Sequence, residues 1–113
     1  MFFAECVLEI RRSNPSVILE CAVPYKGQSS RWSLDYRRRY DAVMKNADKI
    51  TVLSESYTPW CMHVRNRYMV DECERLITLS YGKSGGTQQT IDYAKTKNKE
   101  IVSAFDKNFD DTP

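Results

Sequence analysis

The segment RLITLSYGKSGGTQQTIDYAKTK, residues 75–97, decides the fold class of this chain. Its first part, residues 75–81, is a mostly apolar run that predicts a strand. Residues 82–86 are a glycine-rich loop, and residues 87–97 have the spacing of a helix. Residues 101–105 form another apolar run and predict a further strand. A strand followed by a helix and a second strand is typical of a parallel sheet covered by helices.

The same alternation continues towards the N-terminus. The sequence predicts helices over residues 2–12 and 61–73, and strands over residues 17–23 and 49–53. Ser33 stands where it would cap a further helix that runs to about Asn46. The fold class is therefore α/β, with a parallel sheet and helices on both of its faces. The apolar runs indicate strands buried on both sides, and ligands of such sheets bind beyond the carboxyl ends of the strands.

Apolar residues at helical spacing predict which face of each helix is buried. The first helix presents Cys6, Val7 and Ile10 at this spacing. Asn66 is the polar member of an otherwise apolar stripe, and it must find a partner if it is buried. The predicted buried faces of two later helices are Tyr36, Tyr40, Val43, Met44 and Ala47, and Met62, Asn66, Met69, Val70 and Cys73.

The composition sets limits on the class of protein. The chain has 113 residues, of which 42% are hydrophobic and 28% are charged, as in an ordinary globular domain. The net charge of +2 is too small to indicate nucleic acid by itself. No apolar run reaches the roughly 18 residues that cross a bilayer, and the first residues lack the basic leader of a secretory signal. We therefore expect a cytoplasmic protein without membrane association.

The cysteines give no sign of a metal site. Cys6, Cys21, Cys61 and Cys73 lie far apart and form no CxxC pair, and His63 is the single histidine. This pattern predicts neither a structural zinc site nor a disulfide framework. We expect the cysteines to be reduced and mostly packed, with Cys61 near a loop. The sequence predicts no metal and no cofactor.

The loop before the last helix carries the clearest chemical signal. Gly85 and Gly86 have no Cβ, so the backbone can approach a ligand closely. The first turn of the following helix has free N–H groups, which together with the helix dipole favour an anion. Thr87 would cap the helix or bind a phosphate, and Lys83 adds a mobile positive charge. The loop matches neither Walker A nor GxGxxG, so phosphate binding and a glycine turn without chemical purpose both stay open.

The helix predicted over residues 61–73 carries further polar side chains. Arg65 is a candidate partner for an anion near the glycine loop. Arg67 and Asp71 stand four residues apart and are expected to pair on the surface. His63 is either a base or, as is commoner for a lone histidine, a structural residue.

Several motifs occur together along the chain. They are Pro24-Tyr25, Gln28, Trp32, Arg39-Tyr40, Ala47-Asp48, Tyr57, RNRYMVD at residues 65–71, and Gly85-Gly86-Thr87 with Tyr93-Ala94. Over about residues 1–104 the chain thus resembles the YpsA-like proteins of the SLOG superfamily. This superfamily is a Rossmann-like group that also holds the Lonely Guy phosphoribohydrolases and the DNA-processing protein DprA. The resemblance implies a Rossmann-like fold and a nucleotide or nucleotide-derived ligand at the Gly-Gly-Thr loop.

The Lonely Guy enzymes offer a test for catalysis. Their pattern has Met-His-Glu-Arg and, after a strand, Pro-Gly-Gly-x-Gly-Thr-x-Glu-Glu. Residues 62–65, MHVR, match the first part, so Arg65 falls on the arginine of those enzymes. Gln89 and Thr90 replace the acidic pair. Because N-glycosidic cleavage needs a carboxylate to stabilise the oxocarbenium-like centre, we expect binding without this reaction.

The chain also departs from the family pattern at its beginning. Two strands that precede the helix at residues 2–12 in the family are missing, so we expect an N-terminally truncated domain. This partial domain would cover residues 1–104, and residues 105–113 would be an acidic flexible tail. An exposed sheet edge would pair with a copy of the chain, as a homo-oligomer, or with a complementing chain.

The favoured function is non-catalytic binding of a nucleotide-like small molecule, with a sensor role. Tyr25 and Trp32, together with Tyr57, would stack a base, although aromatic side chains are more often part of a core. The other candidate ligand-binding residues are Gly85, Gly86, Thr87, Arg65, Asn66 and Lys83.

Three alternatives stay open: an interaction fragment without a ligand site, a nucleotide-processing hydrolase, and a single-stranded nucleic-acid binder. The hydrolase candidates are Arg65, Asp71, Glu55 and His63. The nucleic-acid candidates are Arg31, Arg37, Arg38 and Arg39, interleaved with Trp32, Tyr36 and Tyr40. We disfavour nucleic acid as a partner because the two tyrosines lie on the predicted buried side of their helix.

Overall fold

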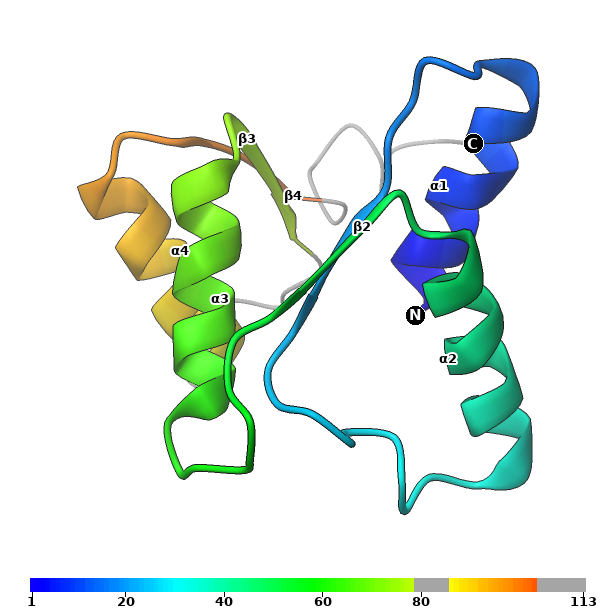
Figure 1. Ribbon diagram of the computed structural model, residues 1–113. Coiled ribbons are helices and arrows are strands. Elements are labelled where there is room, and N and C mark those ends of the chain that lie inside the picture. The colour runs from blue at the N-terminus through cyan, green and yellow to red at the C-terminus, as the bar shows by residue number, and fades with distance from the viewer. Residues whose placement is uncertain (79–85, 104–113) are drawn as a thin grey trace, which may run out of the picture. The chain divides into compact units, whose positions relative to one another are not determined.

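The structure of the chain is a computed structural model that describes residues 1–78 and 86–103. The chain divides into unit 1, Met1–Cys61, and unit 2, Met62–Pro113, and each is described by itself. Each unit contains one two-stranded parallel sheet and helices (Figure 1). The predicted α/β, Rossmann-like class is thereby confirmed. The expected tail at residues 105–113 lies outside the described residues.

Unit 1 alternates helices and strands as predicted. Its elements are α1 (Phe2–Ser13), β1 (Glu20–Val23), α2 (Leu34–Asn46) and β2 (Lys49–Val52). The strands β1 and β2 run parallel, with Glu20 opposite Lys49 and Val23 opposite Val52. Because α2 is the crossover between them, both strands end at the same edge of this sheet.

Unit 2 repeats this pattern. Its described elements are α3 (Cys61–Glu72), which begins at the last residue of unit 1, β3 (Arg75–Thr78), α4 (Gly86–Thr96) and β4 (Glu100–Ser103). The strands β3 and β4 are parallel, from Arg75 opposite Glu100 to Thr78 opposite Ser103. The helix α4 contacts both strands. The predicted strand–helix–strand arrangement of this segment is therefore correct.

The two helices of unit 1 differ in how they begin. The hydroxyl of Ser33 accepts a hydrogen bond from the backbone N–H of Tyr36 at 3.4 Å, which is the predicted N-cap of α2. The helix α1 begins after Met1, whose side chain makes no capping hydrogen bond. Basic side chains, Arg11 and Arg12, lie in the last turn of α1, where they suit the negative end of the helix dipole.

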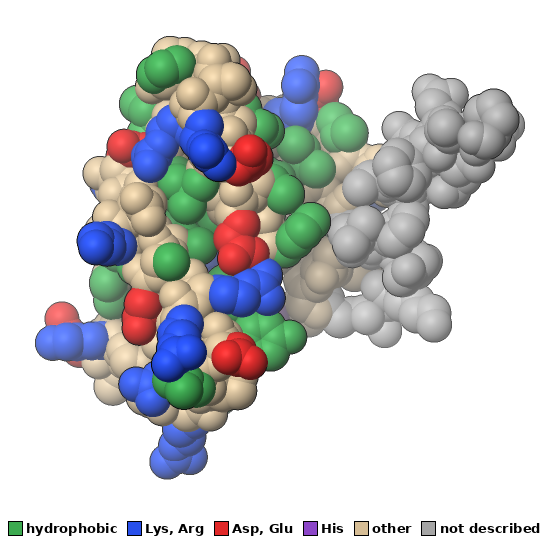
Figure 2. Space-filling model, turned by 90° about the vertical axis from the view of Figure 1, so that its right-hand side faces the viewer, with side chains coloured by type: hydrophobic (Ala, Val, Ile, Leu, Met, Phe, Trp, Pro, Cys, Tyr) green, Lys and Arg blue, Asp and Glu red, His purple; other side chains and the backbone are tan. Residues whose placement is uncertain are grey.

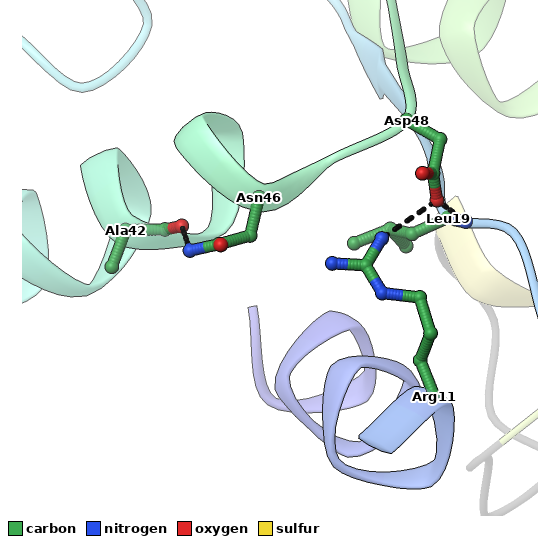
Figure 3. Close-up of polar contacts among 5 residues, drawn as sticks. All are labelled: Arg11, Leu19, Ala42, Asn46 and Asp48. Carbon is green, nitrogen blue, oxygen red and sulfur yellow. Dashed lines mark hydrogen bonds and ion pairs between the residues drawn. The ribbon is translucent and has the colours of Figure 1, made fainter. Parts of the chain in front are cut away.

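Just before β1, the side chain of Asp48 rather than a strand accepts the hydrogen bond from the backbone N–H. Asp48 Oδ2 accepts hydrogen bonds from the Leu19 N–H and from Arg11 Nη1, both at 2.8 Å (Figure 3). The Leu19 carbonyl in turn accepts from the backbone N–H of Asp48 at 2.9 Å. The predicted strand over residues 17–23 therefore begins only at Glu20. The backbone hydrogen bond from Leu19, followed by the Arg11 guanidinium, lowers the pKa of Asp48 below its ordinary value of 3.8.

A second ion pair joins the two helices of unit 1. Arg39 on α2 donates from Nε to Glu5 Oε2 on α1 at 3.0 Å, and from Nη2 to the other carboxylate oxygen. This hydrogen bonding lowers the pKa of Glu5. On the face drawn in Figure 2, acidic and basic side chains alternate with hydrophobic ones rather than forming a basic stripe.

The buried core is small, and several burial predictions are wrong. The apolar side chains buried among the described residues are Leu19, Val23, Pro24, Val43, Cys61, Val70 and Ala94. Cys6 and Ile10 are exposed in α1, as are Tyr36 in α2 and Met62 and Met69 in α3. Ile50 and Val52 of β2 are also exposed, because alternate residues of a strand share one face and this face is not covered.

Other predictions can be compared directly with the described residues. All four cysteines are unbridged; Cys61 is buried, Cys21 and Cys73 are half-buried, and Cys6 is exposed. Within the two described ranges, no helix has the length and apolar character needed to span a bilayer.

We expect Asp48→Asn to lower the free energy of unfolding near neutral pH, because it removes the charge that faces Arg11. The folded-state pKa of Asp48 is depressed, so its contribution is complete above the ordinary value of 3.8 and is lost as pH falls through the lowered value. Urea unfolding across this acid range should therefore show a weaker pH dependence in the variant. Asp41→Asn, an exposed position on α2, is the matched control, and equal losses in both variants would contradict the assignment.

Candidate functional site

The start of α4 is the part of the predicted loop that the structure describes. The helix begins at Gly86, and Gly86 and Thr87 are both exposed. Thr87 therefore lies inside the first turn and is not the cap, which corrects one of its two predicted roles. Among the described residues beyond its chain neighbours, no atom comes within 4 Å of the place where a Cβ of Gly86 would lie. Gly85 and Lys83 lie outside the described residues.

The first turn of α4 has the electrostatics of an anion site. Its first four N–H groups have no partner within the helix, and the helix dipole makes this end positive. The turn contains no acidic residue that would repel an anion. The hydroxyl of Thr90 donates to the Gly86 carbonyl at 2.9 Å, so it stabilises the turn and leaves its N–H groups unoccupied by that side chain.

Arg65 and Asn66 lie next to each other on α3, and they interact. The Nε of Arg65 donates to Asn66 Oδ1 at 2.8 Å, and both side chains are half-buried. This contact satisfies the carbonyl of Asn66, the polar residue for which the sequence required a partner. Its NH₂ group remains a donor, because the amide oxygen is the atom used by Arg65.

A small polar recess lies between α3 and α4. Its volume is about 40 Å³, and it is lined by His63, Asn66, Arg67, Gln89, Thr90 and Tyr93. Among the described residues no carboxylate is part of this lining, whereas a guanidinium, two amides, an imidazole and two hydroxyls are. Such a volume holds a few water molecules or one compact group, and it is too small for a nucleoside. We call it the α3–α4 recess.

Tyr93 joins the two helices at the recess. Its hydroxyl donates to Asp71 Oδ1 at 2.9 Å, and its ring lies under the Arg67 guanidinium, 4.9 Å from the ring centroid. Lys97 Nζ lies 5.5 Å from the same centroid. The predicted Arg67–Asp71 ion pair is thus not formed among the described residues, because Tyr93 contacts both side chains. The sequence pattern missed this arrangement, since Tyr93 is 22 residues from Asp71.

The remaining two candidate residues lie in unit 1. Tyr25 and Trp32 line one cavity of about 490 Å³, together with Tyr57. The rings of Tyr25 and Tyr57 meet edge to face, with their centroids 5.5 Å apart. Sequence reasoning named these three aromatic residues, and the structure brings them together within this unit.

A different groove of unit 1 is less suited to an anion. It lies between α1 and α2, with a volume of about 410 Å³, and its lining includes Arg11, Arg12 and Arg39. Each of these cations is already paired with a carboxylate, at Asp48, Glu9 and Glu5. These three cations are therefore neutralised within the unit. Arg39, one of the candidate residues for binding nucleic acid, is thus already paired with Glu5.

The hydrolase candidates do not form one group within either unit. Arg65, Asp71 and His63 belong to α3 of unit 2, and Glu55 belongs to unit 1. Asp71 accepts the hydrogen bond from Tyr93, and His63 is exposed at the α3–α4 recess. Among the residues with described positions, no three His, Cys, Asp or Glu side chains are grouped to hold a metal ion.

Comparisons with known proteins agree with this architecture. Residues 1–109 match the family named YpsA, described as the YspA SLOG family. The SPbeta prophage-derived protein YoqJ of Bacillus subtilis strain 168 is 28% identical over 102 residues, which cover 80% of this chain and 60% of that protein.

More distant relatives carry the same match. UPF0398 proteins of Halalkalibacterium halodurans and Bacillus thuringiensis are 23% and 24% identical over 103 residues. The matches cover 88% and 89% of this chain but 54% and 56% of those proteins. The chain thus spans little more than half the length of these curated relatives.

The contact between Tyr93 and Asp71 should be measurable as a coupling. We expect Tyr93→Phe and Asp71→Asn each to lower the free energy of unfolding, because each variant weakens the same hydrogen bond. A double-mutant cycle by urea unfolding should give a coupling energy of about 0.5–1 kcal/mol. Strictly additive losses would show that the hydroxyl–carboxylate contact does not stabilise unit 2.

Proposed function

Since the chain belongs to the YpsA SLOG family, we propose that it binds a phosphate-bearing, nucleotide-like small molecule at the start of α4 without chemical turnover. The observation that carries the proposal is an exposed first turn, with no described atom close to the position of a Cβ on Gly86. Phosphate oxygens would accept hydrogen bonds from these N–H groups, as they do at other helix N-termini. A sensor role in the cytoplasm is the biological form of this proposal.

The side chains beside this turn support an anion. The α3–α4 recess offers donors from Asn66, Arg67 and Gln89, and its described lining contains no carboxylate. A phosphoryl group fits its size, whereas a base does not. Arg65 contributes indirectly in this proposal, since its hydrogen bond to Asn66 Oδ1 sets which end of that amide can donate to a ligand. Gly85 and Lys83 belong to the proposed site as sequence neighbours of the turn.

Two residues that line the α3–α4 recess lack the negative charge that cleavage of a nucleotide would need. Gln89 and Thr90 contribute an amide and a hydroxyl at the recess, and neither carries a negative charge. A developing positive charge on a ribosyl centre would therefore lack a facing carboxylate from these two residues. The donors of the recess, Asn66, Arg67 and Gln89, would stabilise a bound anion without promoting its cleavage. This is the behaviour of a binding protein.

We expect Gly86→Asp to reduce protection by nucleoside 5′-monophosphates towards the level that the matching nucleosides give, because its carboxylate would face the phosphate. The added Cβ meets open space, and an acidic residue in a first helical turn favours the helix itself. Thermal unfolding should show the original chain stabilised by about 2.7 kcal/mol at a ligand concentration of 100 times Kd. In the variant Kd should rise by about tenfold or more.

Gly86→Ala is the matched control for this test. It adds the same Cβ in open space without charge, so the N–H groups stay accessible and protection should persist. Inorganic phosphate and nucleosides without phosphate complete the panel of probes. Undiminished protection by monophosphates in Gly86→Asp, or protection that nucleosides give as strongly as their monophosphates, would contradict phosphate binding at α4.

A further inference from the structure

An aromatic cavity of unit 1 follows the ends of both its strands. Its volume is about 490 Å³, within the range of small-molecule sites. It is built from the segments after β1, which ends at Val23, and after β2, which ends at Val52. The lining residues are Tyr25, Gln28, Ser30, Arg31, Trp32 and Tyr57. The cavity thus lies beyond the carboxyl ends of the two parallel strands, where ligands of such sheets bind.

Two ring pairs hold the aromatic walls of this cavity. Tyr25 and Tyr57 meet edge to face at 84°, and Trp32 meets Tyr40 in the same way at 83°, with centroids 5.2 Å apart. Such pairs add to the stability of the rings beyond their burial. Burial also raises the pKa of Tyr40, the ring that pairs with Trp32. Ring walls that are fixed before binding reduce the entropy that a ligand must overcome.

The backbone fixes the loop that carries these side chains. Gly27 has a φ of 81°, which only glycine adopts without strain, and its carbonyl accepts from the Ser30 N–H at 3.0 Å. The Trp32 N–H donates to the Ser29 carbonyl, also at 3.0 Å. The Lys26 N–H donates to the Ser54 carbonyl at 3.0 Å and so joins the two segments of the cavity. The loop is therefore a series of hydrogen-bonded turns.

The polar part of the lining consists of donors. Arg31 is exposed, and it forms no ion pair within the described part of the chain. Gln28 and Ser30 add an amide and a hydroxyl, and the described lining contains no Asp or Glu. A planar guanidinium beside ring faces suits a heteroaromatic ring whose edge bears carbonyl oxygens and ring nitrogens.

We propose that this cavity binds a nucleobase, with the ring against Trp32, Tyr25 and Tyr57 and its polar edge on Arg31 and Gln28. Ring faces bind every base, because each base has a π-face, and the donors select rings with acceptors over plain hydrocarbons. The inference goes beyond phosphate binding at α4, since it concerns contacts of unit 1 alone. Its ligand needs no phosphate.

Trp32 is itself the reporter for the test. The full chain carrying Trp60→Phe leaves Trp32 as the single tryptophan, and Trp60 is exposed and outside the cavity lining. Adenosine, guanosine and uridine should change the emission of Trp32 in a saturable way. Ribose 5-phosphate, which has no ring face, should leave the emission unchanged. No response to any nucleoside, or an equal response to ribose 5-phosphate, would overturn the proposal.

Variants separate the walls from the donors. Tyr57→Leu should raise Kd for nucleosides about tenfold, while Tyr57→Phe, which keeps the ring pair, should bind as the original chain does. Arg31→Gln should raise Kd about fivefold, since it removes a charged donor. Tyr36→Leu, on α2 outside the lining, is the matched aromatic control and should bind normally. Unchanged binding in both Tyr57→Leu and Arg31→Gln would overturn the proposal.

A further comparison keeps the two sites distinguishable. Gly86→Asp should leave the nucleoside response of Trp32 intact, because α4 belongs to unit 2. Retained nucleoside binding with lost phosphate protection supports both assignments. Loss of the nucleoside response in Gly86→Asp, with the fold intact by circular dichroism, would overturn the assignment of the ring to unit 1.

Discussion

Consecutive parallel strands need a crossover, and this constraint governs both units of the chain. In each unit the second strand can lie parallel to the first only if the chain returns through a helix, which is α2 in unit 1 and α4 in unit 2. Both strands of a pair then end at one edge, where the chain leaves as loops. The aromatic cavity follows β1 and β2 at such an edge, and the helix that begins at Gly86 follows β3 along the chain. The two candidate sites therefore arise from the same rule.

Local patterns predict the elements well and the contacts between distant segments poorly. Apolar runs, the Ser33 cap and the Gly-Gly-Thr loop were sufficient to predict each described helix and strand to within a few residues. The predicted start of β1 is wrong because the carboxylate of Asp48, 29 residues away, accepts the hydrogen bond from the Leu19 N–H. The prediction that Tyr36 and the α3 methionines are buried is wrong, because helical spacing identifies an apolar stripe but does not show whether another element covers it.

The candidate sites follow the same division. The start of α4 could be predicted as a candidate anion site because the site depends on backbone N–H groups, and a glycine pair before a helix indicates such a site in the sequence. The α3–α4 recess was not predicted, since Tyr93 had to reach Asp71 and Arg67 on another helix. Of the aromatic cavity, Tyr25 and Trp32 were named from their type, whereas the contribution of Arg31 and Gln28 depends on the turns after Gly27.

The most direct measurement is a backbone amide titration of the labelled chain by nuclear magnetic resonance. Inorganic phosphate is added against sodium chloride of equal ionic strength, and the amides of Gly86, Thr87 and Gln88 are followed. The account predicts saturable downfield shifts of these amide protons, with the amides of Lys95 and Thr96 at the other end of α4 unchanged. Shifts that chloride reproduces, or first-turn amides that do not respond, would contradict phosphate binding by this helix.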